Sequence, residues 1–499
     1  MSENGRTPYG SDAMLGALLR RIMPDLDSES LYRALLAKDT RFDGRFFVGV
    51  ATTGIYCRPV CRARKPLAVN CSFYATAAEA EQAGFRPCLL CRPELAPGYA
   101  PVDSSASLAR AAARYIERNC GVQGSLTDIA RHLGCSNRHL RRVFEDAYHV
   151  RPVEYRQTCR LLLAKSLLTD TDLSVVDVAY SSGFGSLRRF NEVFRRRYRL
   201  TPTALRSQAR LNRADGDTVQ LSLGYRPPYR WDLILKFLAR RAIPGVEKVE
   251  DDRYARTIRL RSSGRDLTGW ATVGNDAEHN RLTVTVSASL LPALPVVLDG
   301  IKNLFDLHCE PDTVARALTS MDESALGPFI PGIRVPGCFD AFETAVLAVL
   351  GQQVTVQAAR TLAGRLVRAL GSPVDTGIDG LTMTFPMVQE LLNLDGAIEQ
   401  HLGPLGIITA RARAIHGLAA MMGSGIIDAS CCPAPEAAVA RFMEIPGIGA
   451  WTAGYIAMRC LAWPDAFLAT DLEVRKALGS PPPGKILTLA ERWKPWRAY

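Results

Sequence analysis

The sequence predicts a multidomain α+β protein of four successive units, because 499 residues exceed what one hydrophobic core can serve. The first, 31–100, is a small α/β unit in which two pairs of cysteines lie among short strand-like runs. The second, 103–210, is an arginine-rich all-α unit with an internal repeat. The third, 217–325, has the alternating pattern of an antiparallel sheet with helices, and the fourth, 329–499, is all-α again.

The composition indicates the cellular location of this chain and the kind of partner that it binds. No apolar run approaches the roughly 18 residues that a membrane span needs, and the N-terminus lacks a charged-then-apolar signal pattern. We therefore expect a cytoplasmic protein without a membrane partner. Thirteen cysteines are an odd number in such a chain, which argues against a disulfide framework. The net charge of +11 favours a polyanionic partner.

The second unit contains a repeat whose copies are 49 residues apart up to a shared glycine and 50 residues apart beyond it. Each copy indicates a helix, a turn with Gly134 or Gly183, and a second helix with exposed arginines. A helical bundle decorated with arginines needs neither the repeated glycine nor the repeated arginines. We therefore expect two tandem helix-turn-helix units suited to the major groove of DNA.

Residues 105–206, which end in the run FRRRYRLTP, resemble the AraC-type DNA-binding domain. The resemblance implies double-stranded promoter DNA as a partner, and RNA polymerase as the partner of a transcriptional activator. The arginines expected on the two recognition helices are Arg138, Arg141, Arg188 and Arg189.

Four cysteines of the first unit form a C-x3-C pair, Cys57 with Cys61, and a C-x2-C pair, Cys88 with Cys91. Two closely spaced thiol pairs can converge on one tetrahedral Zn²⁺, which predicts a small α/β zinc domain. From spacing alone the site is either a structural zinc knuckle or a nucleophile, because a zinc thiolate can serve in either role.

The flanking runs TTGIYCRPVCRAR at 52–64 and GFRPCLLC at 84–91 resemble the Ada-type methylphosphotriester repair domain. The resemblance implies that Cys57 accepts a methyl group from a methylated DNA phosphate, while the other three cysteines complete the zinc site. Four thiolates on Zn²⁺ carry a net charge of about −2, and methylation lowers it to about −1, which predicts tighter DNA binding afterwards. The arginines expected to hold the phosphate backbone are Arg58, Arg62, Arg64 and Arg86.

The run EIPGIGAWTA at 444–453 contains the glycine pair Gly447 and Gly449. Gly-Ile-Gly turns the chain so that backbone N–H groups at a helix N-terminus face a DNA phosphate without reading the base sequence. The run therefore predicts a helix-hairpin-helix motif. A monovalent cation at this hairpin is a further expectation.

A lone G-x-G is a weak signal, but Asp471 follows Trp451 by twenty residues and the run ERWKPWR stands at 491–497. Together these features resemble the AlkA-type 3-methyladenine DNA glycosylases of the helix-hairpin-helix superfamily. Similar runs farther upstream extend the resemblance from about residue 221 to the end of the chain.

The resemblance implies roles for four residues. Asp471 would stabilise the cationic sugar that forms as the N-glycosidic bond breaks, and would orient or deprotonate the attacking water. Trp451 and Tyr455 would hold the flipped alkylated base, and Gln353 would enter the gap left in the duplex. The alternatives are a helix cap for Asp471 and ordinary helix packing for the two aromatic residues.

Helix-hairpin-helix relatives that also cut the strand carry a lysine where this chain has Trp451, so we expect a monofunctional enzyme. No Pro-Cys-His-Arg motif of a second alkyl acceptor is present, and the family continues with a further helix beyond the position of Tyr499. The sequence thus predicts a monomeric alkylation-damage protein that combines methylphosphotriester repair, transcription activation and base excision. The alternatives are a regulator with an inactive, C-terminally truncated glycosylase half, and a zinc regulator without repair chemistry.

Overall fold

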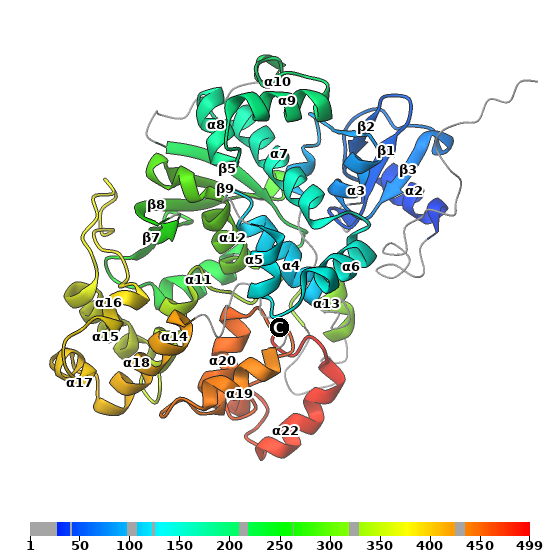
Figure 1. Ribbon diagram of the computed structural model, residues 1–499. Helices are drawn as coiled ribbons and strands as arrows, with labels where there is room; N and C mark the ends of the chain where they lie inside the picture. The colour runs from blue at the N-terminus through cyan, green and yellow to red at the C-terminus, as the bar shows by residue number, and fades with distance from the viewer. Residues whose placement is uncertain are drawn as a thin grey trace, which may run out of the picture.

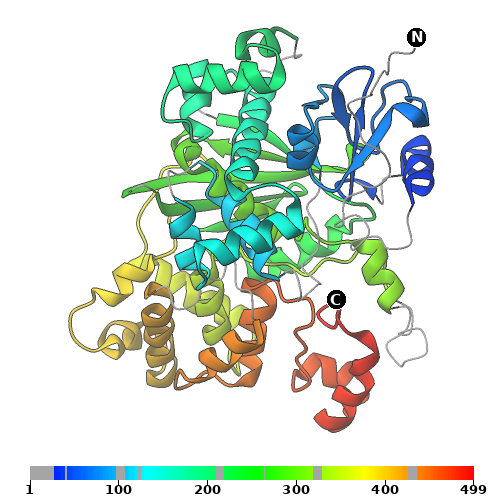
Figure 2. The ribbon, with the colours of Figure 1, turned by 45° about the vertical axis from the view of Figure 1, so that its right-hand side comes forward.

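The chain forms four groups of elements that follow one another along the sequence (Figure 1). A small sheet with two helices and a helical group lie on one side of a larger sheet, and a second helical group lies on the other side (Figures 1 and 2). This is the multidomain α+β fold that the sequence predicts. The computed structural model describes residues 27–39, 42–96, 107–121, 125–208, 218–262, 264–318, 329–424 and 435–499.

The N-terminal group is a four-stranded sheet in the order β3-β1-β2-β4, packed against helices α2 and α3. Strands β2 and β4 are parallel, with Tyr56 opposite Pro87. The residues that follow these two, Cys57 and Cys88, therefore lie at the same end of the sheet. The bounds are α2 Ser28–Ala37, β1 Phe47–Val50, β2 Ile55–Cys57, β3 Cys71–Tyr74, α3 Ala77–Gln82 and β4 Arg86–Pro87, with 3₁₀ turns η3 at Ala68–Asn70 and η4 at Pro93–Leu95.

The second group consists of helices, and the internal repeat corresponds to two helix pairs, α5–α6 and α8–α9, joined by the long helix α7. In each pair the turn contains the predicted glycine in the left-handed region, Gly134 at φ +66° and Gly183 at φ +81°. A side chain at Gly183 would also stand 2.5 Å from the carbonyl oxygen of Cys120. The bounds are α4 Ser107–Arg118, α5 Leu126–His132, α6 Asn137–Tyr148, α7 Pro152–Asp170, α8 Val175–Ser181, α9 Leu187–Tyr198 and α10 Pro202–Gln208.

Serine caps explain where the four repeat helices begin. Each cap hydroxyl accepts a hydrogen bond from a backbone N–H in the first turn and so satisfies a donor that the helix leaves open. Both recognition helices, α6 and α9, start in this way. The four caps are Ser125, Ser136, Ser174 and Ser186.

The third group is a five-stranded antiparallel sheet in the order β5-β9-β8-β7-β6. The alternating run at 282–287 lies in β9, where Leu282, Val284 and Val286 are fully buried, as the period of two predicts. One hydrophobic core continues from α7–α10 into this sheet. The bounds are β5 Thr218–Gly224, α11 Trp231–Arg241, β6 Glu247–Glu250, β7 Arg253–Ser262, β8 Arg265–Asp276, η6 Ala277–His279, β9 Arg281–Ser287, η7 Ala288–Ala293, α12 Leu294–Leu304 and α13 Pro311–Leu318.

The fourth group is helical and has its own core, in which α14, α18, α19 and α20 pack on one another. The segment after α22 packs instead against α13 of the third group, through Trp493 and Trp496. The bounds are α14 Ala341–Leu350, α15 Val356–Leu370, α16 Val388–Leu392, α17 Ile398–Leu402, η9 Gly403–Leu405, α18 Thr409–Gly423, α19 Pro435–Met443, α20 Ala450–Cys460, α21 Leu472–Ala477, α22 Pro483–Ala490 and η10 Glu491–Trp493. None of the described helices is both long enough and apolar enough to cross a membrane.

Buried ion pairs join the N-terminal group to helix α7. Lys165 is fully buried, and its Nζ lies 2.7 Å from both carboxylate oxygens of Glu94 in η4. Arg92 lies beside them and contacts Glu94 at 2.9 Å and Asp170 at 2.5 Å. Removing one partner of such a pair leaves a charge buried without compensation, so these contacts hold η4 in one place on α7.

We predict that Lys165→Met lowers the free energy of unfolding by about 3–5 kcal/mol, because Glu94 then loses the partner that lies against both of its oxygens. Urea titration followed by far-UV circular dichroism measures the change. The double variant Lys165→Met/Glu94→Gln removes both charges and should recover at least half of the loss. Equal unfolding midpoints for the single and double variants would contradict a stabilising role for the pair.

Candidate functional site

The four cysteines predicted to bind zinc come together at the end of the small sheet. Their sulfur atoms all lie within 4.8 Å of one another, and those of Cys61 and Cys88 are 4.0 Å apart. Zn–S bonds of about 2.3 Å in a tetrahedron place the sulfurs about 3.8 Å apart. The donor set and its spacing therefore fit one zinc ion. The four are Cys57, Cys61, Cys88 and Cys91.

The four sulfur atoms differ in their surroundings. Cys61 accepts a hydrogen bond from Ala63 N at 3.5 Å, Cys91 accepts one from Arg58 N at 3.3 Å, and Cys88 accepts one from Cys91 N. Within the described residues, the sulfur of Cys57 has no backbone N–H donor. Hydrogen bonds to a ligand sulfur withdraw charge from it, so Cys57 retains the most negative sulfur. Cys57 and Cys91 are half-buried, whereas Cys61 and Cys88 are buried.

The arginines around this cluster have different environments. Arg58 is 12% exposed and forms a two-pronged ion pair with Asp43, and its third nitrogen donates to Cys91 O at 3.1 Å. Arg58 thus braces the cysteine loop. Arg62 and Arg64 are exposed, and Arg86 is half-buried. Of the four predicted phosphate contacts, Arg58 is thus engaged within the protein, whereas Arg62 and Arg64 face solvent.

A buried carboxylate, Glu81 of α3, joins the cysteine-bearing sheet to the second helix-turn-helix pair. One oxygen accepts hydrogen bonds from the hydroxyls of Tyr56 at 3.0 Å and Tyr198 at 3.4 Å. The other accepts from Thr158 at 3.2 Å and from Arg197 at 3.3 Å. Burial raises the pKa of Glu81, and the Arg197 guanidinium opposes this rise. Tyr56 directly precedes Cys57, so the contacts lead from the cysteine cluster to recognition helix α9.

The predicted DNA-contacting arginines of the two recognition helices point to solvent. The helices bury their apolar sides, Leu140 and Phe144 on α6 and Phe190 and Phe194 on α9. This leaves one basic face on each helix. The exposed arginines are Arg138, Arg141 and Arg142 on α6, and Arg188, Arg189, Arg195 and Arg196 on α9.

The glycine pair lies in the hairpin between α19 and α20. Gly447 has φ +92°, and a Cβ there would approach Ala410 O to 3.3 Å. Gly449 is the N-cap residue of α20 and offers no side-chain cap, and a Cβ there would meet open space. Ile445 and Ile448 are buried and anchor the turn. The first N–H groups of α20 therefore remain available to an anion.

Asp471 caps helix α21 and also contacts the predicted base pocket. Its Oδ1 accepts hydrogen bonds from Glu473 N at 2.9 Å and Val474 N at 3.2 Å, and its Oδ2 accepts one from Trp451 Nε1 at 2.9 Å. The Trp451 ring is stacked on Tyr455 with centroids 5.2 Å apart and planes 12° apart. Three donors thus fix the carboxylate beside a stacked aromatic pair.

Two residues that the sequence analysis did not single out hold this pocket in place. Arg459 is 7% exposed and donates to Tyr455 Oη at 2.6 Å and to Gly337 O at 2.8 Å. Gln352 donates to Gly447 O at 2.9 Å and to Thr452 Oγ1 at 3.0 Å. The partners of Gln352 lie about 100 residues away, and Gly337, which fixes Arg459 beside Tyr455, lies about 120 residues away, so no local pattern marks either residue.

Gln353, the predicted wedge residue, follows α14 in the left-handed conformation at φ +54°. Its side chain is exposed, while its neighbour Gln352 is tied to the hairpin. The loop is therefore held on one side and presents Gln353 to solvent on the other.

Comparison with protein families matches three segments of the chain. Residues 30–94 match the metal binding domain of Ada, residues 129–208 match a helix-turn-helix domain, and residues 220–340 match the AlkA N-terminal domain. These segments contain the cysteine cluster, most of the repeat and the five-stranded sheet, except for the first two residues of β5.

Three curated relatives cover different parts of the chain. The "Probable bifunctional transcriptional activator/DNA repair enzyme AlkA" of Mycobacterium tuberculosis is 37% identical over 95% of this chain and 95% of its own length. The DNA-3-methyladenine glycosylase 2 of Escherichia coli is 37% identical over 56% of this chain and 94% of its own length. The bifunctional transcriptional activator/DNA repair enzyme Ada of Escherichia coli is 36% identical over 32% of this chain and 43% of its own length.

We predict that the chain binds one equivalent of zinc and that Cys61→Ser loses most of it, because a four-sulfur site with a missing thiolate ligand is incomplete. The measurement is zinc released per chain, detected with a colorimetric chelator. The matched control is Cys71→Ser, since Cys71 is a half-buried cysteine outside the cluster. Equal zinc content in the two variants would show that the four sulfurs do not form the site.

Proposed function

The chain belongs to the family of bifunctional transcriptional activator/DNA repair enzymes of the AlkA type, and from this we propose that it repairs alkylated DNA by two reactions and activates transcription. The glycosylase half removes alkylated purines such as 3-methyladenine by hydrolysis. The zinc domain takes a methyl group from a DNA methylphosphotriester. The helix-turn-helix pairs bind promoter DNA. The observation that carries the glycosylase assignment is the hydrogen bond from Trp451 to Asp471, beside the stacked Tyr455 ring.

The geometry around Asp471 supports base excision. As the glycosidic C–N bond breaks, its electron pair leaves with the base, and the sugar becomes cationic. The Asp471 carboxylate, fixed by three N–H donors, stabilises that charge without reorienting. Water then bonds to the sugar carbon and loses a proton to the carboxylate or to solvent. An alkylated purine is already cationic, so it leaves without acid assistance, and the stacked aromatic faces suit it.

A monofunctional reaction fits these residues. Strand-cutting relatives carry a Schiff-base lysine after the hairpin, and here the position holds Trp451, whose indole N–H is engaged with Asp471. Gly447 and Gly449 would bind a phosphate next to the lesion, and Gln353 would fill the gap in the duplex. A monovalent cation at the hairpin belongs to the same proposal.

We predict that Asp471→Asn reduces the release of 3-methyladenine about 10²- to 10⁴-fold, because asparagine can still cap α21 but brings no negative charge to the sugar. Free base released from alkylated duplex DNA is measured by liquid chromatography. Glu473→Gln, two residues away and exposed, is the matched control and should retain activity. A wild-type chain that binds alkylated DNA but releases no base would contradict the glycosylase proposal.

The cysteine cluster supports methyl transfer to Cys57. Zinc, when bound, keeps the four cysteines as thiolates at neutral pH. The sulfur of Cys57 attacks the methyl carbon of the phosphotriester, a C–S bond forms, and the C–O electron pair returns to the phosphate oxygen. Cys57 is half-buried and has no backbone N–H donor among the described residues, and so is the most nucleophilic of the four. The exposed Arg62 and Arg64 would hold the neighbouring phosphates.

Methylation of Cys57 would also tighten the binding of the chain to DNA. The thioether that forms removes about one negative charge from the cluster, so repulsion between the zinc domain and the DNA backbone falls. The exposed arginines of α6 and α9 would then read a promoter. RNA polymerase is the partner expected of an activator.

We predict that Cys57→Ser abolishes transfer of a labelled methyl group from methylated DNA to protein, because the acceptor sulfur is gone. Cys71→Ser, at a half-buried position outside the cluster, should take up one methyl group per chain as the wild type does. Protein-bound label is counted after digestion of the DNA. Label on Cys57→Ser equal to wild type would refute the assignment of the acceptor.

A further inference from the structure

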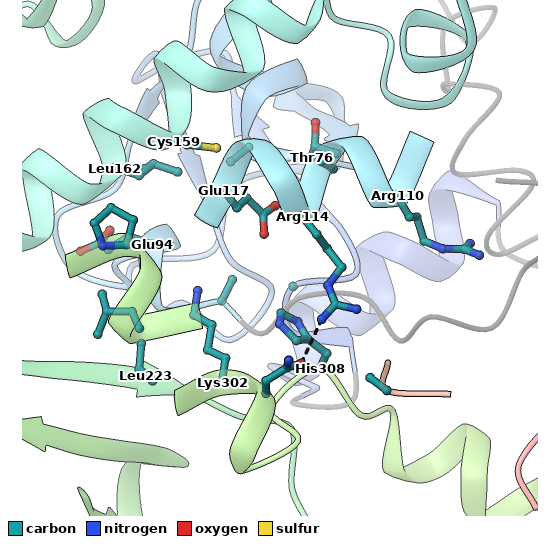
Figure 3. A pocket seen from close by; sticks show the side chains of 18 of the residues that line it. Thr76, Glu94, Arg110, Arg114, Glu117, Cys159, Leu162, Leu223, Lys302 and His308 are labelled. Atoms are coloured by element: carbon teal, nitrogen blue, oxygen red, sulfur yellow. Dashed lines mark hydrogen bonds between the residues drawn. The ribbon is translucent and has the colours of Figure 1, made fainter. Parts of the chain in front are cut away.

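A cavity of about 320 Å³ lies where the N-terminal sheet group, the helix-turn-helix group and the five-stranded sheet group meet (Figure 3). Its wall includes residues of α3, α4, α7, β5 and α12. None of the residues assigned above to methyl transfer, base excision or DNA contact lines it. Its volume is within the range of small-molecule binding pockets, which is roughly 300–1,000 Å³.

One part of the wall is apolar. Leu162 and Leu163 of α7 lie opposite Leu223 of β5, with Pro295 and Leu298 of α12 completing the surface. These residues come from two different groups of the fold. An apolar body placed among them would contact both groups at once.

Another part of the wall carries two cationic side chains, Lys302 and Arg114, that form no ion pair within 4 Å among the described residues. Figure 3 shows Lys302 of α12 pointing toward α4, from which Arg114 and Glu117 come, with His308 beside Arg114. The described residues offer Lys302 neither a hydrogen bond nor an ion pair. Arg114 donates to Asn303 Oδ1 at 2.9 Å, but its buried Nε has no partner in the described structure.

Each carboxylate that lines the cavity accepts a hydrogen bond, and the Glu117 carboxylate also interacts with nearby cations: burial raises its pKa, and the charges of Lys302 and Arg114 oppose this rise. Glu117 accepts a hydrogen bond from the Tyr155 hydroxyl, and Glu94 is paired with Lys165. Asp306 accepts from Tyr499 Oη at 2.8 Å. Two cations, Lys302 and Arg114, thus lie near one carboxylate without an ion pair, Glu117, so the charge of this part of the wall is positive. Burial first, and then the nearby cations Arg114, Lys302 and Arg226, hold the pKa of His308 well below its usual value, which agrees with this excess.

We propose that this cavity binds a small organic anion with an apolar body, such as an aryl or alkyl carboxylate or sulfonate. The anionic group would accept hydrogen bonds from Lys302 Nζ and Arg114 Nε, and the apolar body would lie against Leu162, Leu223 and Leu298. A hydrogen bond between an anion and a half-buried cation is stronger than one between neutral groups, and the Nε atom of Arg114 is itself buried. Because the ligand would contact both the helix-turn-helix group and the five-stranded sheet group, its binding would stabilise their present arrangement and so act as an effector of the chain.

The test uses the full-length zinc-loaded protein and two fluorescent probes that share one body. 8-Anilinonaphthalene-1-sulfonate carries the anion, and N-phenyl-1-naphthylamine lacks it. We expect the sulfonate to bind saturably with one molecule per chain. Lys302→Met should weaken the sulfonate about 10- to 100-fold and leave the neutral probe unchanged, since only the charged hydrogen bond is removed. The matched control is Lys236→Met on the exposed face of α11, which should bind both probes as the wild type does.

A second variant tests the cavity itself. Leu162→Trp fills the apolar part and should prevent binding of both probes, while far-UV circular dichroism and zinc content verify that the chain is folded. Three results would overturn the proposal: no saturable binding at one molecule per chain, equal sulfonate affinity in Lys302→Met and Lys236→Met, or unchanged binding in a folded Leu162→Trp.

Discussion

The arrangement of the zinc domain on the helix-turn-helix domain depends on one buried carboxylate, Glu81. A carboxylate without solvent is tolerated only when donors surround it, because an uncompensated buried charge costs several kcal/mol. Glu81 receives four such donors, from β2, α7 and α9. These hydrogen bonds therefore fix the positions of β2, α7 and α9 relative to one another, although the three elements are distant in the sequence. The Glu94–Lys165 pair fixes the far end of the same interface.

The hydrogen bonds of Glu81 connect the cysteine cluster with recognition helix α9. Tyr56 is bonded to Glu81 and directly precedes Cys57, and Arg197 and Tyr198 at the end of α9 are bonded to the same carboxylate. A change at Cys57 and a change in the position of α9 are thus connected through two hydrogen bonds. The wall of the central cavity includes α7 and α3, which belong to the same interface, so its occupancy would act on the same contacts.

In the glycosylase half one residue, Asp471, has a structural contact on each oxygen and would also serve the proposed chemistry. Asp471 caps α21 through Oδ1 and meets Trp451 through Oδ2. The cap and the catalytic carboxylate are therefore not competing interpretations, because the cap orients the group that the reaction would use. Arg459 fixes the position of Tyr455 by donating a hydrogen bond to its hydroxyl. Gln352 holds the loop after α14 on the hairpin by donating to Gly447 O.

The sequence by itself determined the local features. The cysteine spacing, the repeated glycines of the helix-turn-helix pairs and the alternation in β9 depend on neighbours a few residues apart, and all three predictions are confirmed. Only the tertiary structure decided that Glu81 lies at an interface, that Arg58 braces the cysteine loop against Asp43, and that Lys302 and Arg114 line a cavity. These features join side chains up to about 190 residues apart, such as Arg114 and Asn303. No local pattern encodes such pairings, since each is fixed only when separate units pack together.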